Sequence, residues 1–304
     1  MSVSEIGIPE TGEPLRLLAV HAHPDDESSK GAATTALYVS QGVEVLVATC
    51  TGGERGDILN PAFELGNRDL SDVRREEMKK AAEVLGITHM WLGFIDSGFP
   101  DTEKQEPLPD DCFAAQPLEI AAAPLVEIVR AFRPHIMTTY DELGGYPHPD
   151  HIKTHDVSMY AFEKAADENY PSELPVWSVA KLYYHHTFTK TRVLALHEAC
   201  LAAGIDSPYV DWISDWDGED DKWPRVTTRV SAAEYFEVRD AALLAHATQI
   251  DPNKWLGVPM EIQKAVWPTE DYELAICRLD LAETDIIEDD LFYGLRSERH
   301  ASSV

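Results

Sequence analysis

The apolar positions in the first half of the chain follow an alternating strand and helix pattern. Short apolar runs, typical of strands buried on both faces, occur at 15–20, 43–49, 88–95 and 136–140. Helices are predicted between them at 25–41, 71–85 and 118–132. This alternation predicts an α/β fold with a Rossmann-like, mostly parallel sheet and flanking helices. A glycine fingerprint for a dinucleotide is missing, so the sheet alone does not imply such a cofactor.

The pattern is weaker beyond residue 151. Helices are predicted at 150–166, 192–203 and 232–248, and a strand at 181–188. We therefore divide the chain into a polar leader (1–14), a Rossmann-like region (15–190) and a C-terminal region (191–304). The second of these holds the candidate metal and catalytic residues described below. The third is expected to complete the fold as a smaller subdomain and to line the substrate pocket.

The chain is strongly acidic, with 25 Lys and Arg residues against 54 Asp and Glu residues and a net charge of −29. Such a chain repels nucleic-acid phosphates and anionic lipids, so we expect neither nucleic acid nor membrane as a partner. The four cysteines are far apart, which argues for a reducing compartment and against a zinc ribbon. Without a signal-peptide pattern or an apolar run of about 18 residues, we expect a cytoplasmic protein.

A first group of metal-binding residue types follows the first predicted strand, in the sequence HAHPDDE over residues 21–27. Ligands of open α/β sheets bind at the carboxyl ends of the strands, so this position suits a site. Two histidines and three acids in seven residues suit zinc or a similar divalent ion. Of two adjacent aspartates, one can bind the metal while the other faces water. The alternative is a polar helix start with Asp25 or Asp26 as its N-cap.

A second group, GGYPHPDH over residues 144–151, follows the fourth predicted strand. Two glycines and two prolines favour a fixed loop whose backbone can pass close to a ligand. His148 and His151 lie three residues apart at the start of a predicted helix, where such a pair is often a capping feature. A parallel sheet brings the two groups close to each other, and this coincidence favours a shared metal site.

The motifs AHPDDE and HPDH, in this order, resemble the LmbE-like or PIG-L family of zinc-dependent de-N-acetylases and amidases that act on glucosamine derivatives. The resemblance covers residues 16–246 and implies a Rossmann-like fold with one Zn²⁺ per chain. Within the family, the stretches 28–31, 51–57 and 144–151 resemble enzymes that cleave mycothiol S-conjugates. The HAHPDDES start and the AHATQ stretch at 245–249 are shared with deacetylases of mycothiol synthesis.

The resemblance also implies a role for each motif residue. The implied zinc ligands are His23, Asp26 and His151. Three protein ligands leave a coordination position for water, which zinc acidifies to a pKa near about 7. Asp25 would be the general base, taking the proton of the water and returning it to the departing amine. His148, in its protonated form, and Tyr146 would stabilise the oxyanion.

Other residues near the motifs are candidates for substrate binding. Lys30, one helical turn beyond the first motif, could reach the substrate or could be a solvated surface lysine. The loop after the second strand is expected to line the sugar pocket with Glu54, Arg55 and Asp57. Arg74 and Arg75 lie on an acid-rich helix, where ordinary pairing with neighbouring acids is the expected account.

The resemblance implies hydrolysis of the cysteinyl–glucosamine amide bond of mycothiol S-conjugates, releasing a mercapturate and glucosaminyl-inositol in a detoxification reaction. The alternative is deacetylation of N-acetylglucosaminyl-inositol in mycothiol biosynthesis, which needs room only for an acetyl group. A non-catalytic metal- or sugar-binding module is a third hypothesis. Asp25 argues against it, because a binding site needs no free base. The expected partner is a small-molecule substrate, and the sequence does not indicate the oligomeric state.

Overall fold

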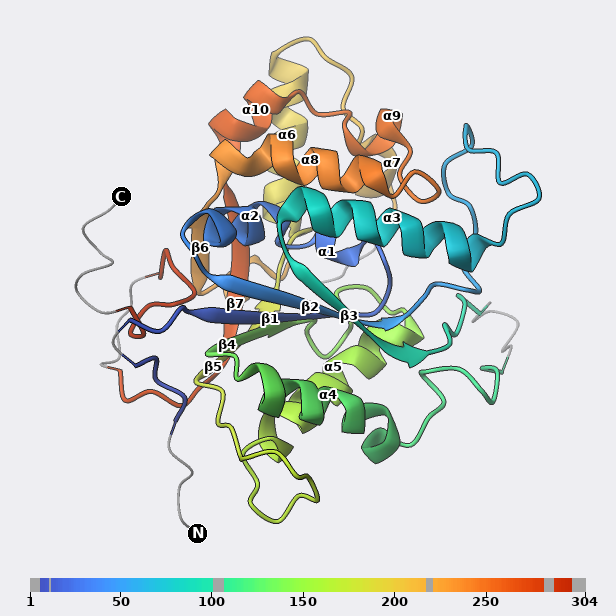
Figure 1. Ribbon diagram of the computed structural model, residues 1–304. Coiled ribbons are helices and arrows are strands. Elements are labelled where there is room, and N and C mark those ends of the chain that lie inside the picture. Colours follow the sequence, from blue (N-terminus) through green and yellow to red (C-terminus); the bar gives the residue numbers. More distant parts are fainter. Residues whose placement is uncertain (1–5, 11, 101–106, 217–220, 282–286, 297–304) are drawn as a thin grey trace.

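The computed structural model describes residues 6–10, 12–100, 107–216, 221–281 and 287–296. The strands in this part of the chain are Arg16–His21 (β1), Glu44–Thr51 (β2), Thr88–Phe94 (β3), Ile136–Thr139 (β4), Lys181–His185 (β5), Thr228–Ser231 (β6) and Thr269–Cys277 (β7). They form one sheet in the order β3-β2-β1-β4-β5-β7-β6 (Figure 1). Strands β1 to β5 are parallel, and β7 is antiparallel to both of its neighbours, β5 and β6.

Helices cover both faces of this sheet, with α4 and α5 on one face and α2, α3 and α8 on the other (Figure 1). The α-helices of the described residues are Asp26–Ser29 (α1), Ala32–Ser40 (α2), Leu70–Leu85 (α3), Leu118–Phe132 (α4), Pro149–Lys164 (α5), Lys190–Ala202 (α6), Val210–Ser214 (α7), Phe236–Ala245 (α8), Pro252–Trp255 (α9) and Met260–Val266 (α10). Two short 3₁₀ helices cover Trp223–Arg225 (η1) and Ala233–Tyr235 (η2).

The central strands are hydrophobic on both faces because both faces are covered. Successive side chains of a strand point to opposite faces. Leu18 and Val20 of β1 accordingly belong to the apolar core that includes residues of α4 and α5, whereas Leu17 belongs to a second core with Tyr38 of α2. The predicted α/β architecture, a mostly parallel sheet with flanking helices, is therefore confirmed.

The C-terminal part of the chain completes the same sheet with β6 and β7, two strands that the apolar pattern of the sequence does not indicate. The attachment is fixed at β5, where the buried ammonium of Lys181 donates hydrogen bonds to the carboxylate of Glu288, at 3.0 Å, and to the carbonyl of Tyr293, at 3.2 Å. The division of the chain at residues 14 and 190 stays a prediction. The leader falls partly outside the described residues.

The predicted helix at 25–41 is in fact two helices, α1 and α2, separated at Gly31. This glycine has a φ of 79°, in the left-handed region that only glycine adopts readily. A Cβ atom here would lie 2.8 Å from the Tyr272 hydroxyl and 2.9 Å from the His185 ring. The break is therefore imposed by β5 and β7, which pack against this turn. Similarly, the predicted helix at 232–248 begins with the turn η2 and ends at Ala245.

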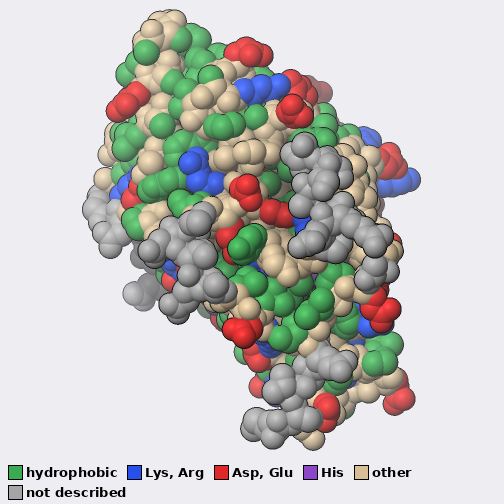
Figure 2. Space-filling view, turned by 90° about the vertical axis from the view of Figure 1, so that its left-hand side faces the viewer, with side chains coloured by type: hydrophobic (Ala, Val, Ile, Leu, Met, Phe, Trp, Pro, Cys, Tyr) green, Lys and Arg blue, Asp and Glu red, His purple; other side chains and the backbone are tan. Residues whose placement is uncertain are grey.

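The described residues include no helix that is both long and apolar enough to cross a membrane. Figure 2 shows the face at the amino ends of the parallel strands, where acidic, basic and hydrophobic side chains are interspersed. No candidate site residue of the sequence analysis follows a strand at that edge. The candidates instead follow the carboxyl ends of the strands.

We expect Gly31→Ala to destabilise the protein more than Gly42→Ala does. Both glycines have positive φ angles, but a Cβ at Gly42 would meet no atom within 4 Å. Gly42→Ala should therefore cost only the backbone strain, about 1 kcal/mol, and Gly31→Ala about 1–3 kcal/mol more for the forced repacking. Urea unfolding of the two variants measures the difference. Equal losses would show that contacts with β5 and β7 do not determine the break.

Candidate active site

The candidate site lies at the point where the connections of the sheet diverge. β1 and β4 are adjacent, but the chain continues from β1 to β2 on one side and from β4 to β5 on the other. Ligands of open α/β sheets bind in the crevice that forms at such a switch point, outside the carboxyl ends of the strands. The segment after β1 carries His23 and Asp26, and the segment after β4 carries His148 and His151.

The three predicted metal ligands are brought together with the spacing that zinc requires. The Nε2 atom of His151 lies 3.3 Å from Nδ1 of His23 and 3.4 Å from Oδ2 of Asp26. The third distance, from Nδ1 of His23 to Oδ2 of Asp26, is 3.7 Å. In tetrahedral coordination with Zn–N bonds of about 2.0–2.1 Å, neighbouring ligand atoms are about 3.3–3.4 Å apart. All three residues are buried, so this group fits a small divalent cation.

The hydrogen bonds of both imidazoles leave the correct nitrogen free for a metal. His151 donates from Nδ1 to the carbonyl of Gly144 at 3.0 Å, so its Nε2 keeps a lone pair. Nε2 of His23 lies 3.3 Å from the Asp150 carboxylate, which leaves Nδ1 of His23 as the lone-pair nitrogen. Carboxylate and carbonyl partners of this kind orient metal-binding histidines in many proteins. Asp150 belongs to a motif that the sequence analysis singled out, although this supporting contact is not predicted there.

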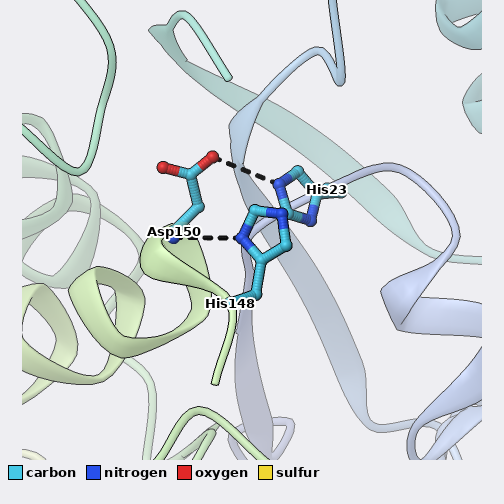
Figure 3. A group of neighbouring side chains, drawn as sticks. All are labelled: His23, His148 and Asp150. Carbon is cyan, nitrogen blue, oxygen red and sulfur yellow. Dashed lines mark hydrogen bonds and ion pairs between the residues drawn. The ribbon is translucent and has the colours of Figure 1, made fainter. Parts of the chain in front are cut away.

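A second buried group, His23, His148 and Asp150, also has ligand atoms close together (Figure 3). Its lone pairs are already used, however. The two carboxylate oxygens of Asp150 accept the backbone N–H groups of Ser97 at 2.8 Å and Ala114 at 3.1 Å, and Nδ1 of His148 accepts the N–H of Asp150 at 3.1 Å. We therefore infer that His148 and Asp150 of this second group do not bind a metal but hold the residues of the first group in position. The capping alternative is also correct for His148, which is the N-cap of α5.

The third predicted ligand, Asp26, is held by two side chains. Its Oδ1 accepts a hydrogen bond from the Lys30 ammonium at 2.6 Å, and its Oδ2 accepts one from the Tyr140 hydroxyl at 2.7 Å. Tyr140 in turn accepts the N–H of Ala22 at 2.9 Å, which ties the end of β4 to the end of β1. Lys30 is therefore not a solvated surface lysine. Its predicted role in substrate binding stays a prediction.

The site carries an excess of buried negative charge. Burial by itself would lower the pKa of His23, but its hydrogen bonds with the carboxylates of Asp150 and Asp96 outweigh burial and raise the pKa to about 10. Without a metal, His23 therefore holds an extra proton, whose positive charge offsets the neighbouring carboxylates. A divalent ion satisfies the same demand with more charge, which is a second reason why these residues fit a metal.

Asp25 is placed beside this group in an unusual backbone conformation. Its φ is 110°, one of only two positive φ angles at non-glycine residues in the described chain. Such strain persists at functional sites when surrounding contacts hold it. Here the N–H of Asp25 donates to the Glu27 carboxylate at 2.9 Å, and the Arg74 guanidinium lies 3.4 Å from the Asp25 carboxylate. Burial raises the pKa of Asp25 to about 6, against the opposing charge of Arg74.

His148 and Tyr146 lie over the same group, but the protonation expected for His148 is not favoured. The ring centroids of His148 and His23 are 4.6 Å apart, and those of Tyr146 and His151 are also 4.6 Å apart. Burial, followed by the charge of His23, lowers the pKa of His148 to about 4. Because Nδ1 of His148 accepts the N–H of Asp150, the neutral ring carries its proton on Nε2. The structure thus favours a neutral His148 ring over an imidazolium.

The loop after β2 makes contacts that differ from those expected for a sugar pocket. The Glu54 carboxylate accepts the N–H groups of Gly52 at 3.2 Å and Asp96 at 3.1 Å. Arg55 donates to the Asp96 carbonyl at 2.8 Å and pairs with Asp111. Both residues thereby fasten this loop to the segment after β3. Asp57 is exposed, and its carbonyl accepts a hydrogen bond from Gln249 at 3.0 Å. The substrate-binding role of these three residues stays a prediction.

Two buried residues near Asp25 were not expected in the site. Arg74 does not pair with acids of its own helix: its guanidinium donates to the carbonyls of Pro24 at 2.7 Å and Gly53 at 3.1 Å. His246, which follows α8, bonds through Nε2 to the Glu27 carboxylate at 2.7 Å. Local sequence could not place either residue, because each contact spans tens to hundreds of positions. The AHATQ stretch, shared with the family, was the one signal that pointed to His246.

The fold and this buried site agree with what comparison with known proteins shows. Residues 18–162 match the family described as "GlcNAc-PI de-N-acetylase" (PIG-L). Together with relatives that match most of the chain, this shows that the chain belongs to the PIG-L family.

Two relatives indicate the branches of the family that this chain resembles. A "Mycothiol S-conjugate amidase" from Streptomyces coelicolor is 56% identical over 289 residues, covering 93% of this chain and 98% of the relative. A "1D-myo-inositol 2-acetamido-2-deoxy-alpha-D-glucopyranoside deacetylase" from Thermobispora bispora is 40% identical over 272 residues, covering 85% and 87% of the two chains. The resemblance stated from the motifs is thereby confirmed.

Solved structures share the fold at low sequence identity. The N,N'-diacetylchitobiose deacetylase from Pyrococcus horikoshii superimposes with a TM-score of 0.59 at 18% identity, covering 85% of this chain and 83% of that one. The conserved protein TT1542 from Thermus thermophilus gives a TM-score of 0.56 at 20% identity, covering 89% of this chain and 100% of that one.

We expect His151→Ala to lose zinc, whereas His197→Ala, a substitution on α6 outside this group, should keep it. Removing His151 leaves two protein ligands, which should weaken zinc binding by about 100-fold or more. Competition of each purified variant with a chromogenic zinc chelator measures the affinity independently of activity. Zinc binding by His151→Ala at the wild-type affinity would contradict the assignment.

Proposed function

We propose that the protein is a zinc-dependent amidase that hydrolyses the cysteinyl–glucosamine amide of mycothiol S-conjugates. The observation that carries this proposal is the near full-length similarity, at 56% identity, to a relative named for that activity. The spacing of His23, Asp26 and His151 supports it, because it supplies the metal site that such hydrolysis requires. The products are a mercapturate and glucosaminyl-inositol, so the role is detoxification of thiol-reactive compounds.

His23, Asp26 and His151 would hold the zinc ion, one per chain. When bound, the ion supplies a Lewis acid that acidifies water and polarises the amide carbonyl. The protein's own contribution is to fix these three ligands through Asp150, Gly144, Lys30 and Tyr140. Held in this way, the ligands need little reorganisation when the substrate binds.

Asp25 acts as general base and then as general acid. It accepts a proton from the attacking water while the new C–O bond forms. When the C–N bond breaks, it returns the proton to the glucosamine nitrogen, which leaves as a free amine. The backbone of Asp25 is held by Glu27, and Arg74 lies beside its carboxylate. In this proposal the carboxylate faces the attacking water and does not bind the ion itself.

His148 and Tyr146 stabilise the oxygen that becomes negative during the attack. Neutral His148 donates from Nε2, and Tyr146 donates from its hydroxyl. The hydrogen bonds of both donors would strengthen as charge develops in the transition state. The loop that carries them is anchored at Asp141, whose carboxylate accepts the N–H of Gly145 at 2.7 Å and the Lys222 ammonium at 2.6 Å.

The competing function is deacetylation of N-acetylglucosaminyl-inositol, which the relative at 40% identity performs according to its name. The chemistry is the same, so the size of the acyl group discriminates between the two reactions. Zinc-loaded protein is incubated separately with a mycothiol S-conjugate and with N-acetylglucosaminyl-inositol, and the released amine is measured. Faster release from the conjugate supports the amidase, and faster release from the acetylated compound overturns it. Release from neither would overturn both.

Asp25→Asn should retain zinc and lose turnover by about 10²-fold or more, the usual scale for a general acid–base group. Asp26→Asn should instead weaken zinc binding, because it removes the charge of a ligand. Metal content and kcat are measured on the same preparations of both variants. The opposite result, with metal lost in Asp25→Asn and retained in Asp26→Asn, would show that the roles of the two aspartates are exchanged.

His148→Ala should lower kcat by about 10²–10³-fold with KM changed little, because the lost hydrogen bond is made mainly in the transition state. His148→Gln restores a neutral N–H donor and should recover part of this loss. Steady-state kinetics of the two variants, with zinc content as control, tests the neutral-donor role. Equal loss of kcat in His148→Gln and His148→Ala would contradict the neutral-donor role.

A further inference from the structure

Three large aromatic side chains form an exposed cluster outside the site described so far. Phe188, Trp212 and Trp255 are 40%, 44% and 40% exposed. The ring centroids of Phe188 and Trp212 are 5.2 Å apart, and those of Phe188 and Trp255 are 6.3 Å apart. The Tyr209 ring stacks on Trp212, with the ring centroids 6.3 Å apart. Gathered exposed aromatic surface of this kind marks a binding site more often than single exposed residues do.

One end of this aromatic cluster is joined to the site through β5. Phe188 follows the carboxyl end of β5 by three residues, and the His185 ring at that end stacks on His21 at 5.4 Å. The N–H of Thr191, just beyond Phe188, donates to the Asp221 carboxylate at 3.0 Å. Lys222, which follows Asp221, donates to the carboxylate of Asp141 and to the carbonyl of Gly145. Both acceptors belong to the loop that carries Tyr146 and His148.

The other end of the cluster is joined to the site through the loop after β2. Trp255 ends α9, which begins just after the stretch 246–250. In that stretch, the carbonyl of Thr248 accepts the N–H of Leu59 at 3.0 Å, and the side chain of Gln249 donates to the carbonyl of Asp57 at 3.0 Å.

The cluster therefore connects segments that approach the site from opposite sides. In the sheet order, β1 and β4 lie between β2 and β5, and their ends carry the metal ligands. Figure 1 shows α7 and α9 in the helix layer on the side toward which the parallel strands run. The helices that carry Trp212 and Trp255 thus lie on the same side of the sheet as the strand ends that form the site, and the hydrogen bonds described above connect their segments with both flanking loops.

We propose that this aromatic cluster binds the apolar substituent on the sulfur of the substrate. The inference rests on the proposed function, since only an S-conjugate has such a group. The glucosamine and the cysteine lie on opposite sides of the scissile amide, so one substrate needs a polar subsite and a separate apolar one. Flat aromatic side chains attract aryl and thioether groups of many shapes without directional hydrogen bonds. The cluster would therefore accept chemically varied conjugates and favour those with large apolar substituents.

The test compares an S-benzyl with an S-methyl mycothiol conjugate as substrates of the zinc-loaded protein. In Trp212→Ala and Trp255→Ala, the ratio of kcat/KM for S-benzyl over S-methyl should fall about tenfold, mainly through KM, which corresponds to about 1.4 kcal/mol of lost stacking. Trp212→Phe should restore most of the ratio. Tyr293→Ala, which removes an exposed aromatic ring near the C-terminal end of the described chain, should leave it at the wild-type value.

Two results would overturn the inference. One is an unchanged substrate ratio in both tryptophan variants. The other is a change of molecular mass in solution on mutation of the cluster, because the rings would then form a contact between copies of the chain. If the wild type hydrolyses neither conjugate, the proposed function fails instead. In that case, equilibrium binding tests the role of the aromatic cluster. Titration of tryptophan fluorescence gives the affinity for each conjugate. Tighter binding of the S-benzyl conjugate supports the inference, and equal affinities overturn it.

Discussion

The burial of several carboxylates at one edge of the sheet is the constraint on which the rest of the site depends. Asp26, Asp96 and Asp150 are almost fully buried around His23. Burying an ionised carboxylate costs several kcal/mol unless donors or cations replace its hydration. Each carboxylate therefore requires partners, and these come from different loops. The approach of the segments that follow β1, β3 and β4 is thus a consequence of electrostatics as much as of chain connectivity.

The partners of these carboxylates also restrict how the site can rearrange. The Asp150 oxygens are occupied by Ser97, Ala114 and His23, and Asp26 is shared between Lys30 and Tyr140. Networks in which every member is satisfied hold a single arrangement, whereas a missing partner would leave an uncompensated charge. The three ligand atoms can therefore keep the spacing of a metal site before any ion binds.

Much of the fold could be predicted because buried parallel strands leave uninterrupted apolar runs. β7 escaped prediction because its sequence, TEDYELAIC, mixes acidic and apolar residues and lacks such a run. The break at Gly31 escaped for another reason: the helical pattern continues through it, and the interruption comes from His185 and Tyr272, far away in sequence. For the site, the two sequence motifs at 21–27 and 144–151 were enough to identify the candidate metal ligands. Arg74, Tyr140 and His246 reach it only by tertiary folding, and the pKa of His148 is lowered by burial and by the charge of His23, neither of which a local pattern reveals.

The order of strands in the sheet has a consequence for how the protein is made. β5 is completed at His185, but β7, which covers its free edge, ends only at Cys277, and Glu288, the partner of Lys181, follows later still. While the ribosome is synthesising the intervening residues, β5 can pair with β4 but its other edge stays open, and Lys181 lacks its carboxylate partner. Such edges pair readily with other chains. A nascent chain is therefore open to pairing at this edge between the synthesis of His185 and that of Glu288.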